Sequence, residues 1–136
     1  MGRNKKKGVL RLDNAMGKSN VDLRYLNFER ADCYRTNFSN SIFENLDMRA
    51  AKFKFCNLSG ANLKNVNLTG ANLKGSDLTN ADLTGANLKN CKIEGANFRG
   101  AIITDANFEH VNKAKARSLN IDVSETDQNK KDTINK

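Results

Sequence analysis

An apolar residue recurs every five positions through most of this chain, and asparagine or aspartate usually precedes it. The period holds from Asp22 to Phe108 without a slip in register, and all eighteen central residues are apolar or carry sulfur. These predicted core residues are Leu23, Phe28, Cys33, Phe38, Phe43, Met48, Phe53, Leu58, Leu63, Leu68, Leu73, Leu78, Leu83, Leu88, Ile93, Phe98, Ile103 and Phe108. A strict short period predicts a solenoid, in which each repeat buries its apolar face only by stacking on its neighbours.

A period of five fits neither a strand, which alternates every two residues, nor a helix, which repeats every 3.6 residues. It does fit a short extended segment with two inward residues, followed by a corner. In the unit 61–65, Ala61 and Leu63 point to the same side, because alternate residues of an extended segment do so. Asn62 and Lys64 then point outward, and Asn65 is the corner. Four units complete a square coil of 20 residues, and residues 20 apart stack at about 4.8 Å.

The corner positions carry residues that tolerate a positive φ in tight turns. They are Gly60, Gly70, Gly75, Gly85, Gly95, Gly100, Asn40, Asn45, Asn65, Asn80 and Asn90. The residue before the centre is Asn or Asp in 14 of 18 units. Such side chains accept hydrogen bonds from local backbone amides at turns, so both positions predict the same corner geometry.

The run from Ala61 to Gly85 follows the pattern Ala-(Asp/Asn)-Leu-x-x, and in this the chain resembles the pentapeptide-repeat family. The resemblance extends over Val21–His110, which is 90 of the 136 residues. It implies an all-β fold, a right-handed quadrilateral β-helix of about four and a half coils. We expect a basic N-terminal segment at 1–20, the β-helix at 21–110 and a C-terminal cap and tail at 111–136.

A solenoid must shield its two ends from solvent. Apolar residues outside the repeats are available for this purpose at both ends. They are Leu10, Leu12, Leu119, Ile121 and Val123. We expect a short helix over residues 111–119 to cover the last coil. Residues 126–136 are polar and mixed in charge, which predicts a disordered tail.

The net charge of +8 lies mostly outside the repeats. Residues 1–20 contribute +5, residues 111–136 contribute +2, and the repeats contribute only +1. The three cysteines fall at inward positions without metal-site spacing, so we expect buried, reduced thiols. Reduced thiols fit a reducing compartment, and no apolar run resembles a signal peptide or membrane span. We therefore expect a cytoplasmic protein.

No residue pattern in the chain indicates catalysis. The single histidine, His110, falls at the exit of the last coil, where a solvated role is typical. Asp77 and Asp82 occupy the same outward position of successive units, on adjacent sides of the square, and no pocket is predicted around them. We expect no catalytic residue, no metal and no cofactor, and hence no enzyme.

Sorting the outward residues by position within the 20-residue coil gives four sides, one of which is basic. That side is centred on Cys33, Phe53, Leu73 and Ile93, and also carries Asp32 and Glu94. Its candidate interaction residues are Tyr34, Arg35, Lys52, Lys54, Phe55, Lys74 and Lys92. Cations interleaved with aromatics match phosphates or an acidic protein surface. Lysines also keep an exposed β surface soluble, which is the alternative explanation.

Three functions follow from these observations. The first is a non-catalytic protein-interaction or scaffold module, a rigid β-helical rod that binds an unidentified protein partner. The resemblance implies the second, because some family members mimic a DNA duplex and protect type II topoisomerases such as gyrase. Those members are strongly acidic, dimerise through their C-terminal ends and often carry loops, whereas this chain has near-neutral repeats, a basic side and no insertion.

The third function is electrostatic binding of nucleic acid or a membrane surface through the basic N-terminal segment and the basic side. Such binding weakens steeply with salt. The N-terminal cluster consists of Arg3, Lys5, Lys6 and Lys7. The sequence also leaves open a homodimer, formed if the Phe108 end of the stack pairs with a second copy into a longer two-fold rod.

Overall fold

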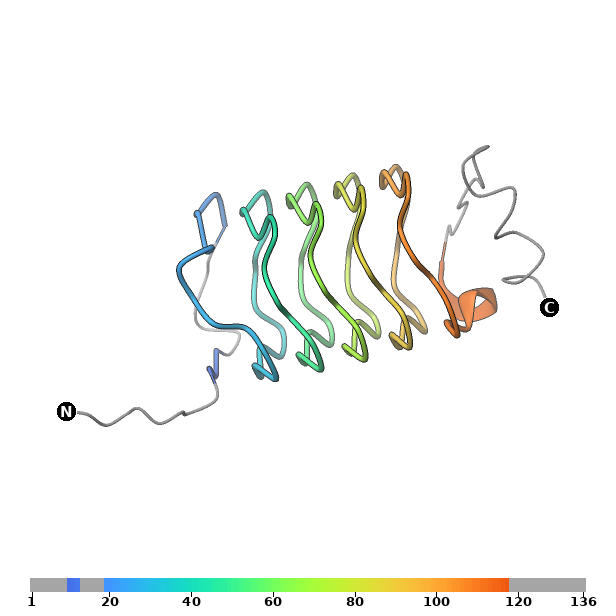
Figure 1. Ribbon diagram of the computed structural model, residues 1–136, viewed down its shortest axis with the longest axis horizontal. Helices are drawn as coiled ribbons and strands as arrows, with labels where there is room; N and C mark the ends of the chain where they lie inside the picture. Colours follow the sequence, from blue (N-terminus) through green and yellow to red (C-terminus); the bar gives the residue numbers. More distant parts are fainter. Residues whose placement is uncertain (1–9, 13–18, 118–136) are drawn as a thin grey trace.

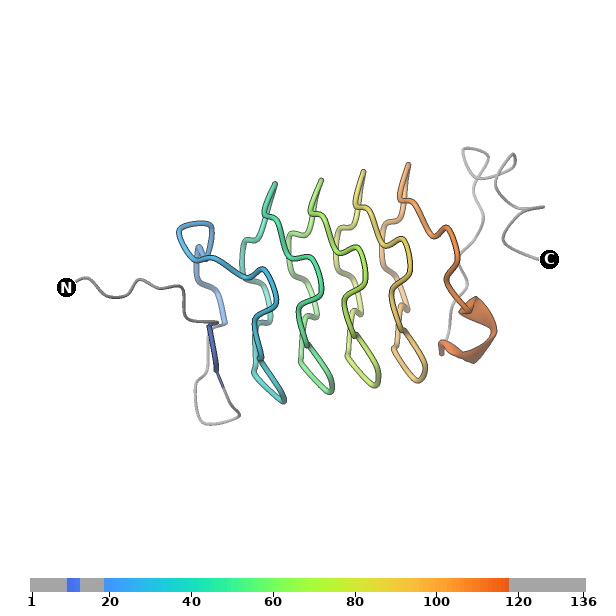
Figure 2. The same ribbon diagram turned by 60° about the horizontal axis from the view of Figure 1, so that its bottom comes forward.

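The computed structural model describes residues 10–12 and 19–117 as a row of coils stacked along one long axis (Figure 1). The described chain starts at one end of the row and finishes at the other. Isolated parallel β-bridges join neighbouring coils, and nearly all link residues 20 apart, as in Asn62 to Asp82. The corners of successive coils stay aligned when the molecule is turned (Figure 2). The five-residue period has therefore become a 20-residue coil.

Each unit hydrogen-bonds to the coil before it and to the coil after it. The Asn62 N–H donates to the Ser41 carbonyl of the preceding coil at 2.9 Å. The Leu63 N–H donates to the Asp82 carbonyl of the following coil at 2.8 Å. The Val66 N–H then donates to the Leu63 carbonyl at 3.3 Å and closes the corner turn. This pattern repeats along the rod, so the backbone groups of the walls find partners without long strands.

The corners have the geometry that their residues predict. Seventeen of the eighteen units place the residue two after the centre at a left-handed φ, between 57° and 75°, and Tyr25 is the exception. The side chain before the centre bonds the turn, as where Asn62 Oδ1 accepts from the Lys64 N–H at 3.1 Å. A turn closed by an i→i+3 bond needs a positive φ at its third residue when it is of type II. Glycine and asparagine meet that need at the lowest steric cost.

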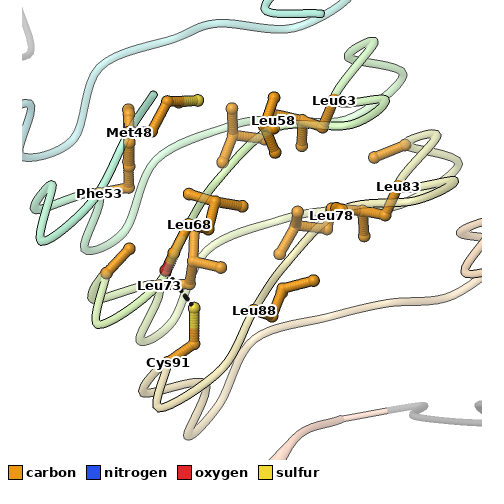
Figure 3. Close-up of a cluster of buried hydrophobic side chains, with 14 of the residues drawn as sticks. Met48, Phe53, Leu58, Leu63, Leu68, Leu73, Leu78, Leu83, Leu88 and Cys91 are labelled. Carbon is orange, nitrogen blue, oxygen red and sulfur yellow. Dashed lines mark hydrogen bonds between the residues drawn. The ribbon is translucent and has the colours of Figure 1, made fainter. Parts of the chain in front are cut away.

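The interior is a continuous stack of apolar side chains. All eighteen centre residues are buried, and even Ile103 is only 8% exposed. Phenylalanines dominate the N-terminal half, where Phe28, Phe38, Phe43 and Phe53 contact one another edge to face or tilted. Leucines dominate the middle, and Figure 3 shows them directed from successive coils into one interior. The residue two before the centre is small in most units, as at Ala61 and Ala71, and leaves room for these larger side chains.

All three cysteines are free and buried. The Cys56 Sγ donates to the Cys33 carbonyl at 2.7 Å, and the Cys91 Sγ donates to the Leu68 carbonyl at 2.9 Å (Figure 3). Burial raises the pKa of Cys33, and it raises the pKa of Cys56 and of Cys91 to about 12. The thiols therefore act as small core groups with weak donors.

We expect these thiols to be inert in the folded protein. With a pKa of about 12, roughly one Cys56 side chain in ten thousand is ionised at pH 8, and the thiolate is the reactive form. A thiol-specific reagent should label no cysteine in native protein over minutes, and all three cysteines in urea. Rapid labelling of native protein, read by mass spectrometry, would contradict the buried positions.

The two ends differ from the regular coils. Leu10 and Leu12 are partly buried against the core, and Arg11 bridges Asp32 at a spacing of 21 residues instead of 20. At the other end the described residues contain one helical element, η2 (Lys113–Lys115), a single 3-10 turn. No helix in the described part of the chain is long and apolar enough to cross a membrane.

The helix expected over 111–119 is thus much shorter in the structure. Arg117 instead bridges Asn97, with its N–H donating to the Ala96 carbonyl at 2.7 Å. Pairing with the open edge of the last coil satisfies backbone groups that a helix would leave without partners. Several predicted features lie outside the described residues: residues 118–119, the caps Leu119, Ile121 and Val123, the C-terminal tail and the lysine cluster near the N-terminus.

Candidate interaction face

The seven candidate residues lie together on one wall of the rod and its corner. We call them the cationic–aromatic face: Tyr34, Arg35, Lys52, Lys54, Phe55, Lys74 and Lys92. Bridges from Asp32 through Lys52 and Asn72 to Lys92 run along this wall. Lys52 and Lys92 are therefore two coils apart, about 9.6 Å at the usual spacing between strands. The exposed rows of the face are thus fixed by the backbone ladder.

A second row of the face lies beside the first. The Arg35 N–H donates to the Lys54 carbonyl at 3.0 Å, and the Phe55 N–H donates to the Lys74 carbonyl at 2.9 Å. Tyr34, Lys54 and Lys74 consequently stack on three successive coils. Arg35 and Phe55 follow them at the corner, each with a φ of 58°. A left-handed φ at these two side chains is sterically costly, and glycine or asparagine takes this position in most other units.

The corner holds a compact group of two aromatic rings and two cations. The Tyr34 and Phe55 rings meet edge to face, with centroids 5.9 Å apart and planes at 82°. The Arg35 guanidinium carbon lies 5.3 Å from the Tyr34 centroid and 5.4 Å from the Phe55 centroid. The Lys54 ammonium lies 5.8 Å from the Phe55 centroid. Cation–π contacts of this kind hold a cation in place while leaving it accessible to solvent.

At the same corner of the following coil, 20 residues after Phe55, lies Gly75, and we call this row of stacked corner residues the corner column. The Phe55 ring occupies the space beside Gly75. A Cβ atom on Gly75 would lie 2.5 Å from the Phe55 Cδ1 and Cε1 atoms. At Gly70, on another corner, a Cβ would meet nothing within 4 Å. Glycine at position 75 is thus required twice, by its φ of 66° and by the ring.

These two glycines provide a prediction. Gly70→Ala should lower the free energy of unfolding by about 1 kcal/mol, the strain of a left-handed alanine alone. Gly75→Ala should lower it by about 2 kcal/mol, because the ring contacts of Phe55 are lost as well. Urea denaturation measures both. In a Phe55→Ala background the difference between the two substitutions should vanish, and a persisting difference would mean that the ring does not lie against Gly75.

Four cations on two other sides of the rod form ion pairs, namely Arg24, Arg49, Lys64 and Lys89, whereas Arg30 and Arg99 form none within the described residues. Arg24 lies 2.8 Å from Asp22, and Arg49 lies 2.7 Å from Asp47. Side-chain hydrogen bonds from Arg24 lower the pKa of Asp22 to about 2, and those from Arg49 lower the pKa of Asp47. These acids and bases neutralise one another locally.

Within the described residues, none of the five cations of the cationic–aromatic face forms an ion pair. Of the two acids on this wall, Asp32 is 3.6 Å from Arg11, outside the repeats. Glu94 is half-buried, and its Oε1 has no hydrogen-bond partner within the described residues. The wall therefore presents uncompensated positive charge, although the repeats as a whole are nearly neutral.

The structure adds three residues that sorting the repeats had not included. Arg11 reaches the wall from the N-terminal segment, and its pairing with Asp32 leaves the five cations uncompensated. Gly75 provides the surface on which Phe55 lies. The Gly95 N–H donates to the Lys115 carbonyl at 2.8 Å, so Lys115 follows the same corner column. The 20-residue spacing predicts the positions of Gly75, which follows Phe55, and of Lys115, which follows Gly95, but not that of Arg11.

The described residues contain no group of three or more His, Cys, Asp and Glu side chains that is placed to hold a metal ion. The face itself combines cations, ring edges and a flat wall. Such an arrangement binds anionic groups, but it brings no nucleophile and base together.

Comparison with known proteins supports the same fold. Eight copies of the Pentapeptide repeats match the chain over residues 19–54, 47–85, 56–95 and 81–112. Among solved structures, the pentapeptide repeat protein Rfr23 from the cyanobacterium Cyanothece 51142 is 25% identical, with a TM-score of 0.63. That match covers 76% of this chain and 80% of the other. No curated protein sequence gives a significant match.

A trypsin-treated variant of QnrB1, a plasmid-mediated fluoroquinolone resistance protein, is 24% identical with a TM-score of 0.61. The match covers 76% of this chain but only 55% of QnrB1, so the chain spans little more than half the length of that protein. An identity this low shows the fold alone. The shared architecture is the right-handed quadrilateral β-helix expected from the repeats.

Proposed function

The chain belongs to the pentapeptide-repeat family, and from that premise we propose that it is a non-catalytic interaction module that binds a protein partner through its cationic–aromatic face. Proteins of this family are generally structural or interaction modules without catalytic activity. A rod of stacked coils presents flat, rigid walls, so a partner binds without ordering the rod itself. The question is then which wall is used.

The observation that carries the proposal is the ion pairing. Arg24, Lys64, Arg49 and Lys89 lie within 4 Å of a carboxylate on their own sides of the rod. On a surface where charge serves only solubility, cations and anions are interspersed and can pair. The cationic–aromatic face holds five cations that form no ion pair within the described residues, although Asp32 and Glu94 share the wall, and it adds two exposed rings, Tyr34 at 43% and Phe55 at 48%. Aromatic side chains and arginine are the residues that protein interfaces favour.

We expect a four-lysine variant to lose its partner. Tagged wild-type protein and the variant K52Q/K54Q/K74Q/K92Q would be used for pull-downs from nuclease-treated host lysate, washed at low and high salt. Four charges, two of them exposed (Lys52 and Lys92) and two half-buried (Lys54 and Lys74), at about 0.5 kcal/mol each make roughly 2 kcal/mol, or a thirtyfold loss of affinity. The protein recovered by the wild type should disappear from the variant.

The matched control removes the same charge from other sides of the rod. The variant R30Q/K64Q/K89Q/R99Q changes the net charge equally and should recover the partner as the wild type does. If both variants lose it, general electrostatic attraction explains the binding. If neither does, the partner uses another wall. Circular dichroism of each variant checks that the rod is intact.

The same experiment tests the alternatives. A gyrase or topoisomerase subunit among the recovered proteins would support protection by DNA mimicry. The charge of this rod disfavours that role, because uncompensated cations along one wall do not resemble a duplex whose backbone is uniformly negative. Material that nuclease removes would instead support the electrostatic nucleic-acid alternative. The cytoplasmic location and the homodimer through the C-terminal end stay predictions.

A further inference from the structure

We infer that the partner presents an acidic, extended polypeptide segment, one carboxylate of which is bound bidentately by Arg35 while others meet the lysines along the rod. This inference rests on the proposed function and names the chemistry of the partner. It follows from the contacts of Arg35 with two aromatic rings, from the spacing of the cations along the rod, and from the arrangement of those rings.

Arg35 is positioned in advance for a planar anion. Its guanidinium carbon lies 5.3 and 5.4 Å from the Tyr34 and Phe55 ring centroids, so two rings restrict it. Arginine stacked on aromatic faces keeps its fork of N–H donors free, and that fork matches a carboxylate with two parallel hydrogen bonds. No carboxylate in the described part of the chain pairs with this guanidinium. We assign the pairing acid to the partner, since no acid among the described residues takes that place.

The cations continue from Arg35 along the axis of the rod. Lys54 and Lys52 lie on the next coil, Lys74 on the coil after it and Lys92 on the one beyond. Four successive coils at about 4.8 Å make a strip of about 14 Å, which an extended chain spans with four to five residues. The cations stand in three rows across the wall, those of Lys52, Lys54 and Arg35, so the strip is roughly 10 Å wide at about 3.3 Å per residue. An extended acidic segment of four to five residues, laid along the axis, brings its carboxylates to all four coils.

The rings argue against nucleic acid as the ligand. A single-stranded nucleic acid gains much of its affinity by stacking bases on open aromatic faces. Here the two rings meet at 82°, and Arg35 and Lys54 lie over them. Phe55 also lies close against Gly75. Tyr34 and Phe55 both keep part of their surface exposed, which suits aliphatic side chains of a polypeptide better than stacked bases.

The test measures binding of purified full-length protein to a fluorescein-labelled peptide by fluorescence anisotropy. The peptide carries about five glutamates in a Gly/Ser background, enough to span the strip at about 3.3 Å per residue. The same peptide with glutamines is the charge control, and a labelled oligothymidine of similar length is the nucleic-acid probe. We expect the glutamate peptide to bind best, and to bind more weakly as salt rises.

The decisive comparison keeps the charge constant. Arg35→Lys should weaken binding of the glutamate peptide about tenfold, because a lysine offers no planar fork. Arg99→Lys, the same exchange at an exposed position on another side of the rod, should leave the affinity within about twofold. Wild-type affinity of R35K, or tighter binding of oligothymidine than of the glutamate peptide, would overturn the inference.

The two proposals fail in different ways. If the lysate partner depends on the four lysines but the peptide binds without regard to Arg35, the interaction face stands and the bidentate acidic anchor is wrong. If the peptide depends on Arg35 but the lysate partner ignores the four lysines, the anchor is real and the assigned role of the face is wrong. Each result thus addresses one proposal.

Discussion

Replacing Phe38 with alanine should lower the free energy of unfolding by about 4 kcal/mol, because a buried ring is lost and a cavity is left. Phe38 is fully buried, and its centroid lies 5.9 Å from Phe28, 5.2 Å from Phe43 and 5.6 Å from Phe53. A solenoid contacts only neighbouring coils, so no distant element can move in to fill the space. Urea denaturation followed by circular dichroism measures the loss.

A second variant and a hydrogen-exchange measurement test whether the loss comes from the cavity at Phe38. Phe38→Leu keeps most of the volume and should lower the free energy of unfolding by about 1 kcal/mol. Hydrogen exchange should show that Phe38→Ala opens the coils around the phenylalanine group before those of the leucine stack. A loss below about 1 kcal/mol for the alanine variant would mean that the interior repacks freely, contrary to the close contacts of the four rings.

The fold was predictable because each five-residue unit of the sequence forms one side of the 20-residue coil. Each unit contains the same three kinds of residue: an inward residue such as Leu63, a turn-binding residue such as Asn62 and a corner residue such as Asn65. Within the repeats, neighbouring units in space are 20 residues apart, so the five-residue register predicts every long-range pairing there. The family match over residues 19–112 confirms the resemblance drawn from those residues.

The ends and the details of the face were not predictable in the same way. Residues 111–117 leave the strict pattern, so helix propensity and edge pairing compete there, and the pairing of Arg117 with Asn97 prevails. On the face, the repeats assign each residue to a wall but not its side-chain conformation. The position of Arg35 between two rings depends on rotamers, and on the room that Gly75 leaves for Phe55.

A single serine inserted between Asn72 and Leu73 should destabilise the rod by roughly 3 to 5 kcal/mol, because it forces a polar residue inward or breaks the ladder. At this point Asn72 donates to the Ala51 carbonyl at 2.9 Å, and Leu73 donates to the Lys92 carbonyl at 2.7 Å. An extra residue between them leaves one coil contact out of register. Urea denaturation and hydrogen exchange should both report the loss in the coils that follow.

Position and length decide what an insertion does, which provides the controls. The same serine inserted between Gly70 and Ala71 falls at a corner, where it can form a small loop, and should cost less than about 1 kcal/mol. Duplication of residues 61–80 adds twenty residues, one complete coil, and should keep or raise stability because each added repeat brings its own interface. If the wall insertion proved as harmless as the corner insertion, the 20-residue register would not hold the fold together. If the duplication unfolded the protein, the coils would not be interchangeable, and stacking of neighbours would be an incomplete account of its stability.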